Sequence, residues 1–286
     1  MSGNGHPPLP PGEPAPDDST GAGFIPTPPL APSVPRDLDT PWDTLDLLVL
    51  FAFALGMLYL LSNLMAVIAV ADFGVPLNKI DQFSSASAGF VVCRQVVWFG
   101  FILLFLHAVI RRRTSQPFWS TIGWRGLQVG TLRPVALVPL LLVAGAALAI
   151  GADIASQFYN TEKQLPIQAL FTSRHGVAYL AAFGILVAPL AEETVFRGYV
   201  YPVLARKFGI LAGILFTGIL FGLVHVPQLW GGWGQIATLV TVGMVLTAVR
   251  AGLRSVFASY LVHLGYNGFL FGGFFLDTNL LQHLQR

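Results

Sequence analysis

The sequence predicts an all-α protein, a polytopic transmembrane bundle of about seven to eight helices that follows a disordered N-terminal arm. Charged residues make up only 10% of the 286 residues and apolar residues 54%, whereas about a quarter of the residues in soluble domains are charged. Several apolar runs are also long enough to cross a bilayer, which takes about 20 residues per helix. Because lipid offers no partners to backbone N–H and C=O groups, such runs form helices.

The first 41 residues differ from the rest of the chain in composition. They hold twelve of the twenty prolines, with repeated Gly, Ser and Asp, and show no helical or strand periodicity. We therefore expect residues 1–41 to be disordered or extended. No basic region leads directly into an apolar core, so this segment does not resemble a signal peptide.

The apolar runs define seven candidate spans. They are Leu45–Val70, Ala88–Ile110, Val135–Ser156, Val177–Ala205, Ile210–Val226, Ile236–Val249 and Val256–Leu276. The first three lie within an N-terminal group of transmembrane helices, residues 42–160. Residues 277–286 form a C-terminal tail.

Lys and Arg beside the spans predict the orientation. Four clusters fit one side of the membrane: Arg111 to Arg113, Arg125 with Arg133, Arg206 with Lys207, and Arg250 with Arg254. Basic residues are enriched on the cytoplasmic side. We therefore expect an integral, multi-pass protein of the plasma or inner membrane, with a cytoplasmic N-terminus and, for seven spans, a C-terminus outside. Trp119 and Trp124, beside these clusters, are expected to be interface anchors.

Composition argues against several other classes of function. The formal net charge is only +2 and no basic stripe is present, so we expect the bilayer, and no nucleic acid, as a partner. The single cysteine, Cys93, cannot form a disulfide or a cysteine-ligated zinc site within one chain. Four histidines outside the motifs below are expected to have no functional role: His6, His107, His175 and His283.

The fourth expected span carries three charges in the motif "EETVFR". Glu193 and Arg197 are four residues apart, so they share one helix face and can pair. Glu192 points about 100° away from Glu193 and has no such partner. Ionisable residues inside a membrane are costly and mark functional sites.

Two later spans repeat the spacing of four. In "FGLVH", Phe221 lies one turn from His225, and in "HLGYN", His263 lies one turn from Asn267. We expect the polar edges of the three helices to be buried together, because each would be costly in lipid.

These side chains suggest two kinds of function. Glu192 and His225 could hold and deprotonate a water, while His263 and Asn267 could donate hydrogen bonds to the oxyanion that forms when water attacks a carbonyl. The same residues could instead serve packing or proton transfer in a non-catalytic scaffold or a transporter. The spacing alone leaves both interpretations open.

The positions of the motifs along their spans predict different depths in the membrane. At about 1.5 Å per residue, Glu192, His225 and His263 do not fall at one depth. Either the helices are kinked or broken, for which Pro189, Gly218, Gly222 and Pro227 offer causes, or the expected boundaries of the spans are wrong.

The three motifs, in this order on three successive apolar helices, resemble those of the CPBP family. This is an intramembrane protease family of CAAX prenyl endopeptidases and bacteriocin-processing (Abi) proteins that includes the type II Ras-converting enzyme. Its motifs are paired glutamates followed by an aromatic residue and arginine, phenylalanine four residues before histidine, and histidine four residues before asparagine. This sequence fills every position. The resemblance predicts a catalytic transmembrane domain over residues 177–272.

The resemblance implies a hydrolase, an intramembrane endopeptidase that cleaves a peptide or protein near the membrane, as in CAAX processing. It also implies roles for individual residues. Glu192 would be the water-activating base assisted by His225, His263 and Asn267 would be the oxyanion donors, and Glu193, Arg197 and Phe221 would support them.

The resemblance leaves metal dependence open. Members of the family have often been called metalloproteases, and Glu192, His225 and His263 could bind zinc with an open position for water. However, the sequence has no HExxH motif, and a glutamate-activated water requires no cofactor. Both interpretations stay open.

Overall fold

The computed structural model describes residues 35, 37–127, 134–159, 167, 170–171 and 173–278, all within one compact unit, Val34–Arg286. Every regular element in these ranges is a helix, which confirms the predicted fold class. The expected arm, residues 1–41, lies outside the described residues except for 35 and 37–41. Of the expected tail, residues 277–286, only 277 and 278 are described.

Six of the seven expected spans are helical throughout, whereas the fifth, Ile210–Val226, is helical only to Leu223, so His225 lies in the turn after the helix. The elements are α1 (Thr44–Ala71), η1 (Leu77–Lys79), α2 (Ile80–Ala86), α3 (Ala88–Arg113), α4 (Phe118–Thr121), α5 (Pro134–Ser156), α6 (Arg174–Ala182), η3 (Phe183–Val187), α7 (Ala188–Glu193), η4 (Thr194–Val200), α8 (Tyr201–Phe208), α9 (Ile210–Leu223), α10 (Trp233–Leu253) and α11 (Val256–Asp277). The elements from α6 to α8 form one continuous stretch, the central stretch, in which η3 and η4 are π-helical.

The protein is a multi-pass membrane protein. Within the described ranges, five helices are long and apolar enough to cross a membrane: α1, α3, α5, the central stretch and α10. The other two expected spans differ. With 14 residues, α9 is only about 21 Å long, less than the roughly 30 Å of hydrocarbon. With 22 residues, α11 is long enough to cross a membrane, but it includes the polar Ser259, His263 and Asn267 and is not among these five helices.

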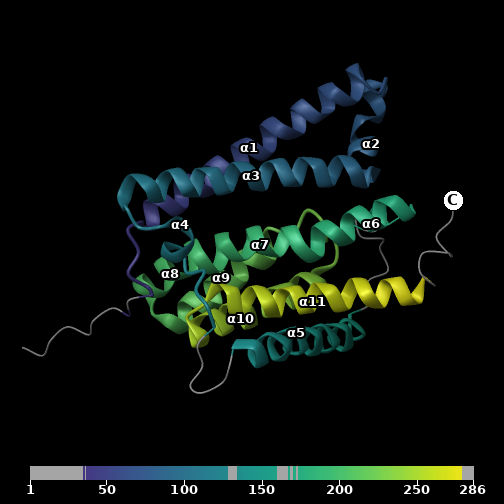
Figure 1. Ribbon diagram of the computed structural model, residues 1–286. Helices are drawn as coiled ribbons and strands as arrows, with labels where there is room; N and C mark the ends of the chain where they lie inside the picture. Colours follow the sequence, from purple (N-terminus) through teal and green to yellow (C-terminus); the bar gives the residue numbers. More distant parts are fainter. Residues whose placement is uncertain are drawn as a thin grey trace, which may run out of the picture. The chain divides into compact units, whose positions relative to one another are not determined.

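The central stretch lies between two groups of helices (Figure 1). On one side it packs against α1 and α3 through an apolar cluster that includes Leu106 and Tyr199. On the other side it contacts α11, and α5 and α10 pack with α11 through a second cluster that includes Leu141 and Leu261. The central stretch, which carries the first motif, is thus held from both sides.

Two glycines let α5 and α11 approach closely. A Cβ atom at Gly145 would collide with the carbonyl oxygen of Val262, and one at Gly265 would collide with the backbone of Leu142. Small residues at such contacts are typical of helix packing in membranes. Because the backbones are in contact, the rotation of α11 is fixed, and with it the direction in which His263 points.

The described basic clusters gather at one end of the bundle, where α1 begins and α3 and α8 end (Figure 1). Arg113 pairs with Asp46 in the first turn of α1 at 2.7 Å. Arg206 donates to the carbonyl oxygens of Thr40 and Trp42 at 2.8 and 2.9 Å. Arg133, which we expect on the same side, lies outside the described residues. That these clusters lie on one side of a membrane stays a prediction. The cytoplasmic location of this end stays a prediction.

Residues 37–41, the last of the expected arm, pack over this basic end together with Trp42. Trp42 is buried, its ring stacks on Tyr199 with centroids 4.8 Å apart, and its Nε1 donates to the Tyr199 carbonyl at 2.9 Å. Arg250, which we counted among the charges beside the membrane, is instead buried and donates to Asp37 Oδ2 at 3.1 Å. This segment therefore links α10 to the central stretch.

Candidate functional site

Two π-helical segments flank the short helix α7, which carries both glutamates of the first motif. η3 ends at Val187, Pro189 lies in the first turn of α7, and η4 begins directly after Glu193. The central stretch continues through Pro189 without a break, and the irregularity near this residue takes the form of π turns on both sides of α7. Such turns are rare and occur frequently at functional sites.

Glu193 is fully buried and lies at the centre of a hydrogen-bonded cluster. Arg197 Nη1 donates to its Oε1 at 2.8 Å, which confirms the expected ion pair. Ser259 Oγ donates to Oε2 at 2.6 Å, and His263 Nδ1 lies 2.8 Å from Oε1. Arg197 Nη2 also donates to the Gly243 carbonyl of α10 at 3.0 Å. Side chains of the central stretch and of α11 therefore hold this carboxylate, and α10 holds its partner Arg197.

Glu192 faces two histidines. Its Oε1 lies 3.9 Å from His225 Nε2 and its Oε2 lies 3.8 Å from His263 Nε2. These separations are longer than a direct hydrogen bond and suit a bridging water. The side chains of Glu192 and His225 are 16% and 18% exposed, whereas those of Glu193 and His263 are 0% and 4% exposed. The cluster is therefore accessible at Glu192 and His225.

Neighbouring acceptors determine the tautomers of both histidines. His225 Nδ1 lies 2.7 Å from the carbonyl oxygen of Phe221, which can only accept, so we assign the hydrogen to Nδ1. The Glu193 carboxylate also accepts only, so the hydrogen of the His263 ring is likewise assigned to Nδ1. In the neutral form of either ring, Nε2 then presents a lone pair toward Glu192.

Phe221 packs against three members of the site. Its ring centroid lies 4.9 Å from that of His225 and 5.8 Å from that of His263, and the Arg197 guanidinium lies 4.5 Å above it. The expected contact between Phe221 and His225 is confirmed. The apolar ring of Phe221 therefore packs directly against the polar side chains of Arg197, His225 and His263.

Asn267 lies one turn beyond His263 on α11. Its Nδ2 donates a hydrogen bond to the carbonyl of Gly184 in η3 at 2.7 Å. The structure thus brings Glu192, His225 and His263 together. The Asn267 amide is hydrogen-bonded to the backbone of the central stretch.

Two residues that form hydrogen bonds with the first motif were not predicted from the sequence. Ser259 lies four residues before His263, so the spacing of four that linked His263 to Asn267 could have revealed it. Trp124, which we expect to be an interface anchor, donates from Nε1 to Thr194 Oγ1 at 2.9 Å. No sequence signal links Trp124 to this motif.

The side chains do not fit a zinc ion. Within the described ranges, no group of three or more His, Cys, Asp and Glu residues could hold a metal. Ligands around tetrahedral zinc lie roughly 3.4 Å apart, whereas the Glu192 oxygens lie 3.9 and 3.8 Å from the two Nε2 atoms. We therefore derive no step through a metal.

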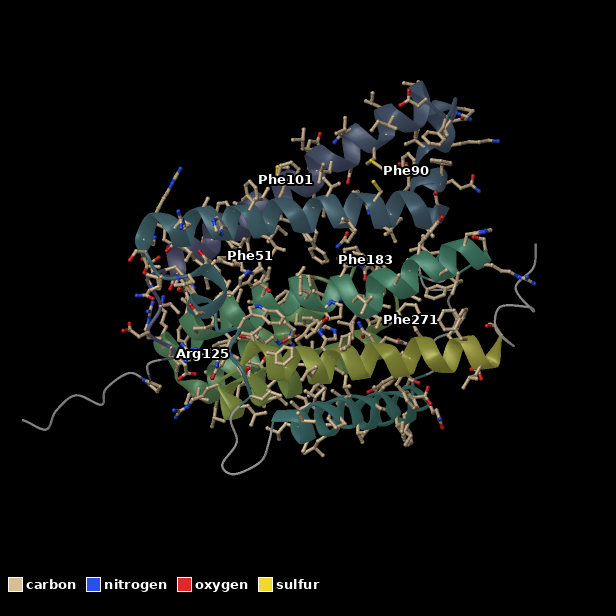
Figure 2. The ribbon with its side chains drawn as sticks, in the orientation of Figure 1. Phe51, Phe90, Phe101, Arg125, Phe183 and Phe271 are labelled. Atoms are coloured by element: carbon tan, nitrogen blue, oxygen red, sulfur yellow. The ribbon has the colours of Figure 1, made fainter. Side chains whose placement is uncertain are left out.

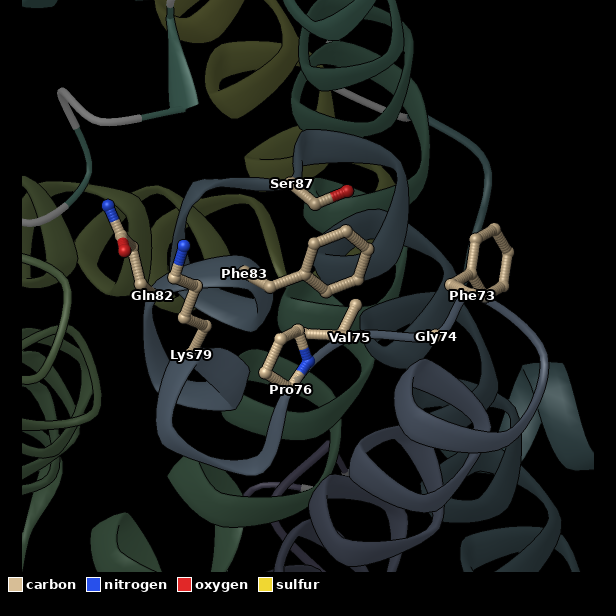
Figure 3. Close-up of a pocket in the computed structure, with 8 residues that line it drawn as sticks. All are labelled: Phe73, Gly74, Val75, Pro76, Lys79, Gln82, Phe83 and Ser87. Carbon is tan, nitrogen blue, oxygen red and sulfur yellow. The ribbon is translucent and has the colours of Figure 1, made fainter.

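A hollow of about 490 Å³ lies elsewhere, beyond the C-terminal end of α1 (Figure 3). Its lining includes Phe73, Pro76, Lys79 and Phe83. No residue of the three motifs lines it, so it is separate from the candidate site.

Fold and site together define a class: a multi-pass helical membrane protein with a carboxylate and two imidazoles at an accessible edge of a buried ionic cluster. Residues 174–269, from the start of α6 into α11, match the family model described as "Type II CAAX prenyl endopeptidase Rce1-like". This part of the chain is a domain of that intramembrane protease family, so the protein is a hydrolase. Comparisons with curated proteins and with solved structures found no match.

Proposed function

We propose that the protein is an intramembrane endopeptidase that hydrolyses a peptide bond with Glu192 as general base. One observation carries this proposal: the Nε2 atoms of His225 and His263 lie 3.9 and 3.8 Å from the two oxygens of Glu192. This carboxylate lies at the accessible edge of the cluster. The family match over residues 174–269 supports the proposal.

The catalytic water would lie between Glu192 Oε1 and His225 Nε2. Both atoms are acceptors, so the water donates one hydrogen to each and keeps a lone pair for the carbonyl carbon. As the new C–O bond forms, Glu192 takes the proton. When the tetrahedral intermediate collapses and the C–N bond breaks, Glu192 returns this proton to the leaving amine.

His263 and Asn267 are the proposed oxyanion donors. In the protonated form of the His263 ring, both nitrogens are donors, and Nδ1 faces Glu193. His263 Nε2 then carries a hydrogen that can be donated to the oxyanion. The amide of Asn267 has a second hydrogen besides the one on the Gly184 carbonyl.

We further propose that the substrate is a membrane-associated chain, lipidated or amphipathic, that is cleaved near its C-terminus. The family's description as a CAAX prenyl endopeptidase supports this class. Residues 177–272 would be the catalytic domain and residues 42–160 an accompanying group of transmembrane helices. The gathering of basic residues at one end supports a cytoplasmic location of that end, and so of the N-terminus.

The test is cleavage by the purified protein in detergent. The probes are a farnesylated peptide that ends in a CAAX sequence and the same peptide without the lipid, in water enriched in ¹⁸O. We expect loss of the last three residues, with one ¹⁸O atom in the new carboxylate. Preference for the unlipidated peptide would overturn the substrate class, and no cleavage by folded protein would overturn the proposed activity.

A further inference from the structure

A side-chain hydrogen bond joins α11 to a backbone carbonyl inside the central stretch. Asn267 Nδ2 donates to the Gly184 oxygen at 2.7 Å. Ordinarily a carbonyl within a helix accepts from a backbone N–H of the same helix.

Gly184 lacks this donor for two local reasons. In an α-helix its partner would be the N–H of Ala188, but Ala188 donates to Phe183, five residues back, because η3 is π-helical. In the π pattern its partner would be residue 189, which is a proline and has no N–H. An unpaired carbonyl at membrane depth is costly, and the Asn267 amide supplies the missing donor.

We propose that Asn267 is a positioning residue that secures the π turn η3 and thereby the place of Glu192. Two residues one turn apart on α11 hold the central stretch at two points: Asn267 at Gly184 and His263 at Glu193. Glu192 lies between these points in the chain. The backbone attachment at Gly184 is thus part of what keeps Glu192 facing His263.

Packing on both sides supports this attachment. In Figure 2, Phe183 lies between the central stretch and α3, and Phe271 lies between the stretch and α11. The ring of Phe183 stacks with Phe99 of α3 at a centroid distance of 6.0 Å. A Cβ atom at Gly184 would meet the ring of Phe271. The π turn is therefore in close contact with α11 on the side where Asn267 donates.

A double-mutant cycle tests the proposal without any substrate. N267L removes the donor, and P189A restores a backbone N–H that can complete the helix around Gly184, which makes the hydrogen bond from Asn267 to Gly184 redundant. Membrane-embedded hydrogen bonds are typically worth roughly 3- to 20-fold in an equilibrium constant. We expect N267L alone to raise the unfolding equilibrium constant in detergent by about this factor, and to have a clearly smaller effect in the P189A background.

Equal effects of N267L in the two backgrounds would overturn the proposal. P139A, which removes a proline inside α5, is the matched control and should not reduce the effect of N267L. If N267L alone does not fold, recovery of folded protein in P189A/N267L supports the proposal, and failure in both backgrounds overturns it.

Catalysis gives a second readout, and this part rests on the proposed function. We expect N267L to lower kcat for the farnesylated CAAX peptide with little change in KM, and P189A to restore part of the loss. A residue that only donates to the oxyanion would lower kcat equally in both backgrounds. If the wild type does not cleave the peptide, the proposed function fails, while the unfolding cycle still decides the role of Asn267.

Discussion

His263 Nδ1 lies 2.8 Å from Glu193 Oε1, while its Nε2 faces Glu192 Oε2 at 3.8 Å. One imidazole therefore connects the two adjacent glutamates of the first motif. Glu193 is buried and held by three side chains, whereas Glu192 is partly exposed and lies beyond hydrogen-bond distance of both histidines. The two glutamates differ in what surrounds them, so substitutions at Glu192 and at Glu193 should have different effects.

Glu193→Gln should destabilise the protein. The substitution leaves the buried Arg197 guanidinium without its counter-charge, and breaking a buried pair costs about 3–5 kcal/mol. Denaturation in detergent measures the effect, and Glu192→Gln is the matched control, expected within about 1 kcal/mol of wild type. The same loss of stability in both variants would show that the two carboxylates are held alike, contrary to the structure.

Ser259→Ala should leave the Glu193 carboxylate less firmly oriented and the protein less stable. The hydroxyl donates to Glu193 Oε2 at 2.6 Å in a fully buried place, and a hydrogen bond to a charged group contributes about 1.5–3 kcal/mol. We expect a loss of that order in unfolding experiments together with a lower kcat. Ser120→Ala, at an exposed position, is the control and should be neutral. A neutral Ser259→Ala would refute this role.

Asp37→Ala should loosen the basic end of the bundle. Asp37 accepts from buried Arg250 at 3.1 Å, so its removal leaves a buried charge unpaired at a cost of about 3–5 kcal/mol. Asp39, two residues away and exposed, is the control, because surface substitutions usually fall within about 0.5 kcal/mol. Thermal unfolding of Asp37→Ala and Asp39→Ala compares them. Indistinguishable unfolding would mean that residues 37–42 are not an anchor.

Cleavage should survive removal of metal ions. The separations around Glu192 exceed those of zinc ligands, and a water between Glu192 and His225 needs no metal. We expect unchanged turnover after chelation and dialysis, with metal content confirmed by elemental analysis. Activity that disappears on chelation and returns with zinc would contradict the metal-free mechanism.

Local features of the fold and site could be predicted from the sequence. The apolar runs determine the helices because their length suits a bilayer. The pair of Glu193 with Arg197 follows from helix geometry alone, since residues four apart share a face.

Contacts between helices could not be predicted in the same way. His263 meets Glu193 directly because the rotation of α11 depends on its packing against Gly145 of α5, and the bond from Asn267 to Gly184 exists because of a π turn that no spacing rule reveals. The packing of Trp42 was hidden by the proline-rich composition before it. Such features depend on the tertiary structure rather than on local propensity.

Turnover of the farnesylated CAAX peptide by Glu192→Gln, beside its unfolding curve, tests the central claim most directly. General acid–base catalysis contributes about 10²- to 10⁴-fold, so we predict a loss of kcat in that range with unfolding unchanged. A folded Glu192→Gln variant that cleaves the peptide as fast as wild type would contradict the assignment of Glu192 as the base.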